Sequence, residues 1–242
     1  MKIKVFDNPT QMGYMIAKEV AAQLNTKPES VLILPTGSTP IPTYKSIVEM
    51  YKNGEVSFKD AVTFNLDEYI GIESDHEERY YNFMQRNLFS HVDIKPENIN
   101  IPDNQTTDCE KECVDYEAKY RASGCADLAL LGIGNNGHIG FNEPGTAFDS
   151  VTHVTSIAES TIKANARFFA SEDLVPKQAM TMGISTILSA KKIFILITGK
   201  GKHDILMKLL NTAAADESIP ATALRLHPDV TIYADREAAG LI

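Results

Sequence analysis

The chain has 242 residues, 43% of them hydrophobic and 23% charged, which is the composition of a globular protein that can bury a full core. Its formal net charge of −9 argues against a nucleic-acid or anionic-membrane surface, because such surfaces need clustered Lys and Arg. No apolar run is long enough to span a membrane, and the N-terminal run is too short for a signal peptide.

Short apolar runs alternate with longer amphipathic segments along the chain. Strands are predicted, in chain order, at residues 2–6, 31–35, 61–66, 127–133, 151–157, 192–198 and 230–234. Helices are predicted at residues 9–25, 40–53, 77–90, 109–122 and 200–214. Several strands are almost continuous in Val, Ile and Leu, which is typical of strands covered on both faces. The alternation predicts an α/β fold with a single doubly wound, mostly parallel sheet and helices on both faces.

The sequence contains no Ser/Gly-rich linker, internal repeat or low-complexity tract. We therefore expect one catalytic domain over residues 1–242, with the irregular stretch 142–175 as a candidate lid segment. The three cysteines, Cys109, Cys113 and Cys125, are odd in number and accompany no export signal, which favours a reducing, cytoplasmic location. None has a partner at metal-ligand spacing, so no metal site is expected.

In a doubly wound sheet, ligands bind beyond the carboxyl ends of the strands. The strand VLIL is followed by small polar residues ahead of Pro40, which opens a predicted helix. Their N–H groups and hydroxyls would face an anion at a helix N-terminus. A plain capped turn is the alternative interpretation. The residues of this candidate phosphate loop are Thr36, Gly37, Ser38 and Thr39.

A second strand, AVTFNL, runs directly into Asp67 and Glu68. Adjacent side chains of an extended chain point to opposite faces, so at most one of these acids enters a common pocket. A carboxylate that is partly desolvated in a cleft has a raised pKa and can abstract a carbon-bound proton near neutral pH. A helix cap or a solvated loop charge is the simpler alternative.

The stretch GIGNNGHIGFNEPG follows the strand predicted at residues 127–133 and places His138 and Glu143 among five glycines. His can give and take a proton near pH 7, and a nearby carboxylate can orient it. The string matches G-x-G-x-x-G, but it follows the fourth predicted strand rather than the first, so we reject a dinucleotide site. A glycine-rich turn with a structural His stays an alternative.

Two basic features remain: Arg167 in ANARFF, and Lys200 and Lys202 in ITGKGKH directly after a buried strand. Each residue alone is more typical of a surface charge. Together with a helix N-terminus, two basic side chains would bind a phosphate monoester.

The motifs LPTGSTP, FNLDEY, GIGNNGHIGFNEPG, ANARFF and TGKGK occur in the order and spacing of the glucosamine-6-phosphate deaminases. The resemblance extends from the first strand to about His227, and NLDEY combined with GHIGFNEP is its specific part. It implies conversion of D-glucosamine 6-phosphate and water to D-fructose 6-phosphate and ammonium, in amino-sugar catabolism. It implies no metal and no organic cofactor.

The resemblance also implies roles for single residues. Asp67 resembles the base that moves a proton between C2 and C1 through a cis-enediol. His138 resembles the residue that opens the pyranose ring, and Glu143 the acid that supports it. The phosphate cradle would consist of Thr36, Gly37, Ser38, Thr39, Arg167 and Lys202.

The chain departs from the family pattern in two places. Many members carry Asp where this chain has Asn136, a position that belongs to the catalytic group around His138, so we expect Glu143 to be the main partner of His138. Hexameric members that are activated by N-acetylglucosamine 6-phosphate carry basic residues where this chain has His153 and Thr155, and a longer tail. We therefore expect a monomer or small homo-oligomer rather than an allosteric hexamer.

Two other functions compete with the deaminase. A 6-phosphogluconolactonase shares the expected fold and a glycine-rich segment with a His, but it needs an activated water rather than a carbon-acid base. A sugar-phosphate sensor domain would be expected to carry a DNA-binding segment before the first strand, which here starts at Lys2.

Overall fold

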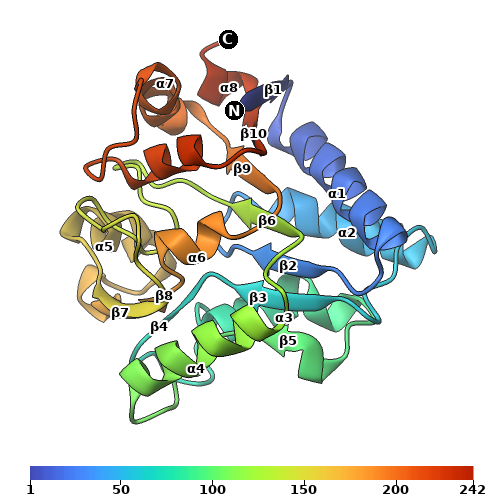
Figure 1. The fold of residues 1–242 in the computed structure, drawn as a ribbon, viewed down its shortest axis with the longest axis horizontal. Coiled ribbons are helices and arrows are strands. Elements are labelled where there is room, and N and C mark those ends of the chain that lie inside the picture. Colours follow the sequence, from blue (N-terminus) through green and yellow to red (C-terminus); the bar gives the residue numbers. More distant parts are fainter. Residues whose placement is uncertain (242) are drawn as a thin grey trace.

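The computed structural model describes residues 1–241, so the predicted domain end at Ile242 lies outside the described residues. Within them, a seven-stranded sheet has the order β1-β10-β9-β6-β2-β3-β5 (Figure 1), and every pairing between neighbouring strands is parallel. The mostly parallel sheet predicted from the sequence is confirmed. Its strands are β1 Lys2–Phe6, β2 Val31–Leu34, β3 Val62–Asn65, β5 Ile99–Asn100, β6 Leu128–Leu131, β9 Ile193–Ile197 and β10 Val230–Asp235.

Helices cover both faces of this sheet, and each face has its own core. Leu32 and Leu34 of β2 pack toward the core that the first three helices share, whereas Val31 and Ile33 pack toward the core of the other face. This alternation explains why the central strands β2, β6 and β9 are apolar at every position. The helices on the first face are α1 Pro9–Thr26, α2 Ile41–Lys52 and α3 Tyr80–Asn87. Those on the second face are α4 Cys109–Ala122, α6 Ile184–Leu188, α7 His203–Asn211 and α8 Arg236–Ala239.

Two predicted helices are shorter than expected, because part of each segment folds as a 3₁₀ turn. The segment 77–90 contains α3 and then the turn Phe89–His91, and the segment 200–214 begins with the turn Lys200–Lys202. Pro40 lies at the N-cap and α2 begins at Ile41. None of the helices in residues 1–241 is both long and apolar enough to cross a membrane.

A second sheet, which the sequence analysis did not predict, consists of β4 Asp67–Tyr69, β8 Gln178–Thr181 and β7 His153–Ser156. Its pairings are antiparallel. The strand predicted at residues 151–157 forms here rather than in the central sheet. Only Leu66 separates β3 from β4, so the chain passes from one sheet to the other immediately before Asp67.

The segment 142–175 contains β7 and the short helix α5 Glu159–Asn165, followed by two 3₁₀ turns. Figure 1 shows α5 beside the small sheet, at the margin of the central one. A moving lid in this segment stays a prediction.

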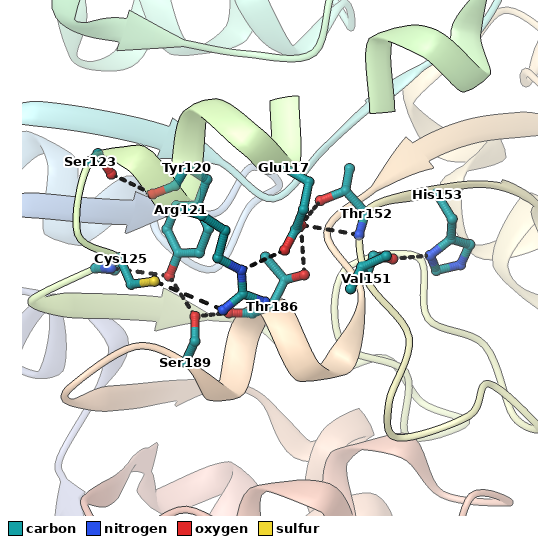
Figure 2. A network of polar contacts seen from close by, with 11 residues as sticks. Glu117, Tyr120, Arg121, Ser123, Cys125, Val151, Thr152, His153, Thr186 and Ser189 are labelled. Carbon is teal, nitrogen blue, oxygen red and sulfur yellow. Dashed lines mark hydrogen bonds and ion pairs between the residues drawn. The ribbon is translucent and has the colours of Figure 1, made fainter. Parts of the chain in front are cut away.

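Glu117 of α4 fixes the chain where it enters this segment. Its carboxylate accepts hydrogen bonds from the Thr152 N–H and hydroxyl, from the Thr186 hydroxyl of α6 at 2.8 Å, and from Arg121 Nε at 2.7 Å (Figure 2). Gly183 lies against the same stretch, because a Cβ there would meet the Ser150 and Val151 carbonyl oxygens at 2.3 Å. The small sheet is thereby held against the second face of the central sheet.

We expect Glu117→Gln to lower the free energy of unfolding by about 1–3 kcal/mol at pH 7, because a charged acceptor of several hydrogen bonds is lost. Burial opposes ionisation of Glu117, but the bonds from Thr152, Thr186 and Arg121 outweigh it and lower its pKa. A carboxyl group whose pKa is lowered by folding stabilises the folded protein at pH values above its pKa in the unfolded chain. This stabilisation is lost as the pH falls through its pKa in the folded protein. The difference between the two proteins should therefore shrink in acid, as measured by urea unfolding between pH 7 and pH 3.

Glu110→Gln on the exposed side of the same helix is the matched control and should lower the free energy of unfolding by less than Glu117→Gln, by about 0.3–1 kcal/mol, because only the interaction of a first-turn charge with the helix dipole is lost. Equal losses in both variants would contradict the role of Glu117.

Candidate active site

A pocket of about 660 Å³ opens at the carboxyl ends of the central strands. It is walled by the loops after β2, β3, β6 and β9, together with α5 and the turn that follows it. This is the place where a doubly wound sheet binds its ligand. The candidate residues that line it are Thr36, Gly37, Ser38, Thr39, Asp67, Asn136, His138, Arg167 and Lys202. Glu143 lies behind His138 and is 9% exposed.

Asp67 and Glu68 point in different directions, as the alternation of an extended chain requires. Asp67 lines the pocket and is only 7% exposed. Burial raises its pKa to about 8, and the charge of neighbouring Glu68 adds to the shift. A carboxyl group with a pKa near neutrality is suited to take up a carbon-bound proton and return it.

Glu68 has a structural role. Its carboxylate accepts hydrogen bonds from the backbone N–H groups of Tyr69 at 2.9 Å, Tyr80 at 3.0 Å and Tyr81 at 3.1 Å. Tyr80 and Tyr81 open α3, so Glu68 caps the positive end of that helix. Burial raises the pKa of Glu68 to about 7, although these hydrogen bonds oppose the shift. The helix-cap alternative is thus correct for Glu68, whereas Asp67 faces the pocket.

The glycines around His138 make room for its ring. A Cβ on Gly134 would lie 2.2 Å from Cε1 of the His138 imidazole, so any residue with a side chain at that position would displace the ring. Gly140 has a φ of +58°, and a Cβ there would lie 2.9 Å from Thr181 Oγ1 and 3.5 Å from Asp67 Oδ2. The glycines therefore let the imidazole and the Asp67 carboxylate approach the same stretch of backbone.

Glu143 and its partners hold His138 from behind. The Nδ1 atom of His138 lies 3.4 Å from Glu143 Oε2, and that oxygen also accepts a 2.6 Å hydrogen bond from Asn136 Nδ2. Thr161 of α5 donates its hydroxyl hydrogen to Glu143 Oε1 at 2.6 Å. Burial opposes the charge on Glu143, but the bond to His138 and its charge, with the bonds from Thr161 and Asn136, lower the pKa of Glu143 to about 2. Glu143 is therefore a permanent carboxylate beside the imidazole.

The loop after β2 offers its hydroxyls to the pocket. The N-cap of α2 is Pro40, which cannot make a side-chain capping bond, and the Ile41 N–H bonds to the Ser38 carbonyl oxygen at 3.4 Å rather than to a Ser or Thr hydroxyl. Gly37 has a φ of +89°, a conformation that a residue with a side chain rarely adopts. These features favour the anion-binding interpretation of the loop over a plain capped turn.

Lys202 and Arg167 supply positive charge at the pocket wall. The Lys202 ammonium donates one hydrogen bond to the Ile133 carbonyl at 2.7 Å, which leaves its other two hydrogens for a ligand. Burial, together with the charge of Arg167, lowers the pKa of Lys202 to about 8. Gly199, at the start of this loop, is held by hydrogen bonds from its N–H to the Asp235 carboxylate at 3.0 and 3.1 Å.

The sequence analysis missed two polar residues of α5. Thr161 contacts both members of the His138–Glu143 pair, and Asn165 donates a 2.9 Å hydrogen bond to the Tyr69 hydroxyl next to Asp67. Thr and Asn are common on helices, so neither residue type signals a site. The only hint was their position shortly before ANARFF, in the segment considered as a lid.

The cysteines are free thiols, and no group of three or more His, Cys, Asp and Glu side chains within residues 1–241 is arranged to hold a metal ion. The pocket contains the buried carboxyl group of Asp67, the His138–Glu143 pair, and the loops with residues 36–39 and Lys202 that could bind an anion.

We expect Gly134→Ala to lower the free energy of unfolding by about 1–3 kcal/mol, because its methyl group overlaps the His138 imidazole and the ring must move. Gly132→Ala is the matched control in the same loop, since a Cβ there meets no atom within 4 Å. Thermal or urea unfolding measures both. Equal stability of the two variants would show that the imidazole does not occupy the space at Gly134.

The chain matches the model of a family described as glucosamine-6-phosphate isomerases/6-phosphogluconolactonase over residues 9–233. It is 48% identical to a glucosamine-6-phosphate deaminase from Thermoanaerobacter pseudethanolicus, over 100% of this chain and 95% of the relative. It is similar to the solved structure of a monomeric glucosamine-6-phosphate deaminase, with a TM-score of 0.97, 46% identity and full coverage of both chains. A 6-phosphogluconolactonase from Thermotoga maritima, with a TM-score of 0.75, 20% identity and coverage of 97% of this chain and 98% of its own, shares the fold alone. The family resemblance of the sequence motifs is confirmed, and the chain belongs to the glucosamine-6-phosphate isomerase/6-phosphogluconolactonase family.

Proposed function

We propose that this protein is a glucosamine-6-phosphate deaminase, which converts D-glucosamine 6-phosphate and water to D-fructose 6-phosphate and ammonium. The observation that carries the proposal is Asp67, a buried carboxyl group with a pKa raised to about 8, in the same pocket as the His138–Glu143 pair. The full-length similarity to deaminases supports it.

In the proposed reaction the phosphate group binds at one end of the pocket. The hydroxyls and N–H groups of residues 36–39 would hold it together with Arg167 and Lys202. An anchor of this kind places the sugar ring against the reactive groups and removes the entropic cost of orienting it during the chemical steps.

His138 would open the ring, taking the proton of the C1 hydroxyl and returning it to the ring oxygen. Ionised Asp67 would then take the proton from C2 and deliver it to C1, while a second proton passes from the ammonium group to O1, so the amino aldehyde becomes an iminium ion at C2 with a hydroxyl group at C1. Water hydrolyses the iminium ion, so the ketose and ammonium leave and Asp67 is again a carboxylate. Two proton carriers of different pKa in one pocket suit these consecutive transfers.

The lactonase alternative has less support. Hydrolysis of a lactone needs one base to activate water, and it gives no task to Asp67 once His138 fills that role. The likeness to the Thermotoga maritima lactonase, at 20% identity, bears on the fold alone. A sensor domain without turnover would need neither proton carrier.

We further infer that the protein is a monomer or small homo-oligomer without allosteric activation. The similar structure with a TM-score of 0.97 is that of a monomeric deaminase, and His153 and Thr155 stand where activated members have basic residues. A cytoplasmic location agrees with the three free cysteines. Residues 1–242 would form one catalytic domain, with residues 142–175 as its lid.

We expect Asp67→Asn to lower kcat for ammonium release by about 10²- to 10⁴-fold, the usual contribution of a general base, with little change in KM. In the wild type, Asp67 acts only when ionised and Lys202 attracts the phosphate only when protonated, so kcat/KM should rise toward pH 8 and fall above it. The measurement is initial-rate release of ammonium and fructose 6-phosphate from glucosamine 6-phosphate between pH 6 and pH 9.

Asp75→Asn, in an exposed loop, is the matched control and should behave as the wild type. Equal rates for Asp67→Asn and wild type would remove Asp67 from the mechanism. A wild type that releases no ammonium but hydrolyses 6-phosphogluconolactone would establish the lactonase alternative.

The charge of Lys202 predicts a second pH dependence. Lys202 attracts a phosphate only when protonated, so the Kd for D-fructose 6-phosphate, which lacks an amine, should rise above pH 8 by up to about tenfold per pH unit. Calorimetric titration between pH 7 and pH 9.5 measures this effect. Lys202→Met should bind weakly at every pH, without the steep rise.

Lys200→Met is the control, since Lys200 is an exposed cation in the same turn. A wild-type Kd that does not change between pH 7 and pH 9.5 would remove the Lys202 ammonium from the phosphate site.

A further inference from the structure

Thr161 is a buried residue of α5 that contacts both members of the candidate proton-transfer pair. It is 4% exposed, and its Oγ1 lies 2.6 Å from Glu143 Oε1 and 3.3 Å from His138 Nδ1. The nearest other donor to Glu143 Oε1 is the Ala158 N–H at 3.4 Å, so the hydroxyl is the main partner of that oxygen.

The direction of these hydrogen bonds determines the tautomer of the imidazole. The Glu143 carboxylate can only accept, so the hydrogen of the Thr161 hydroxyl lies on the bond to Oε1. The Thr161 oxygen then faces His138 Nδ1 as an acceptor, and so does Glu143 Oε2 at 3.4 Å. Two acceptors at Nδ1 require that this nitrogen carries the hydrogen.

A hydrogen on Nδ1 leaves Nε2 of the neutral ring with a free lone pair. Within residues 1–241 the hydrogen bonds of the His138 ring run through Nδ1, and the ring forms part of the pocket wall. Nε2 is therefore the atom that can take a proton from a ligand and return it.

The same helix reaches the other half of the pocket. Asn165, one turn after Thr161, donates to the Tyr69 hydroxyl at 2.9 Å, and Tyr69 is two residues from Asp67. Arg167 follows directly after the helix and lines the pocket. The short α5 thus connects the side of the pocket that holds Arg167 with the His138–Glu143 pair.

We propose that Thr161 is a positioning residue for ring opening, whose hydroxyl holds the His138 imidazole as the Nδ1–H tautomer with Nε2 free to act on the sugar. This inference rests on the proposed function, because ring opening is a step of that reaction. Thr161 itself touches no reacting atom. It acts through His138 and Glu143.

The test compares Thr161→Val, which keeps the shape of the side chain and removes the hydroxyl, with Thr161→Ser, which keeps the hydroxyl. We expect kcat to fall about tenfold in Thr161→Val, as for the loss of one hydrogen bond to a charged group, with KM unchanged. Thr161→Ser should restore most of the rate. Lys163→Ala, on the exposed side of the same helix, is the control and should behave as the wild type.

The pKa of Glu143 separates positioning from a general loss of structure. The Thr161 hydroxyl stabilises the charged form of Glu143, and within residues 1–241 the titratable side chain that faces this carboxylate is His138. Removal of the hydroxyl should raise the pKa of Glu143, which the ¹³C chemical shift of the Glu143 carboxyl carbon would show as a titration midpoint at higher pH in Thr161→Val that returns in Thr161→Ser.

The tautomer can be read without turnover, from the ¹⁵N chemical shifts of the His138 ring, identified by their loss in His138→Gln. We expect a protonated Nδ1 and a bare Nε2 in the wild type near neutral pH, and a mixture of tautomers in Thr161→Val. A bare Nδ1 in the wild type, or a Thr161→Val variant with wild-type kcat and tautomer, would overturn the proposal. Absence of ammonium release from a wild type with protonated Nδ1 would count against the proposed function instead.

Discussion

The seven strands of the central sheet run in one direction, and the position of every candidate group depends on this constraint. Parallel strands end at a common edge, so the loops after β2, β6 and β9 face the same pocket. The loops after β2 and β6 meet there although they lie about 100 residues apart in the sequence. The central strands β2, β6 and β9 are apolar and buried on both faces, so they have no place for polar chemistry. The polar groups are thereby confined to the loops, where small residues allow a ligand to approach the backbone.

The sequence predicted six of the seven strands of the central sheet, because most of them are apolar runs with a helix between them, but it missed β5, which has only two residues. It did not predict the small sheet, since β4 has only three residues and two of them are acids. Its partner β8, with the sequence QAMT, lacks the β-branched run that marks a strand, and the two pair across more than a hundred positions of chain. Asp67, His138 and Lys202 were identified because each follows a strand end. Thr161 was not, because its importance comes from packing against Glu143, which local sequence does not show.

Asp67 and Lys202 show how burial prepares the pocket for a charged ligand. Each has a pKa of about 8, the first raised and the second lowered, because burial disfavours the charged form of both. In the proposed reaction the substrate brings a phosphate to Lys202 and an ammonium group near Asp67. Each ligand charge would stabilise the ionised form of the group that it meets. Binding would therefore help to ionise the base, and the protein need not keep a bare carboxylate in an empty, poorly solvated pocket.

The Asn at position 136 has a consequence for the charge of the His138–Glu143 pair. Asn136 Nδ2 donates to Glu143 Oε2 at 2.6 Å, while its Oδ1 accepts from the His138 backbone N–H at 3.2 Å. An aspartate in the same place would set a second carboxylate against Glu143, and two like charges at that distance would force one of them to take up a proton. Asparagine instead stabilises the charge on Glu143, whose pKa is about 2. Glu143 therefore remains an acceptor for His138 Nδ1 throughout the neutral range, and the imidazole does not need a second acid to keep its orientation.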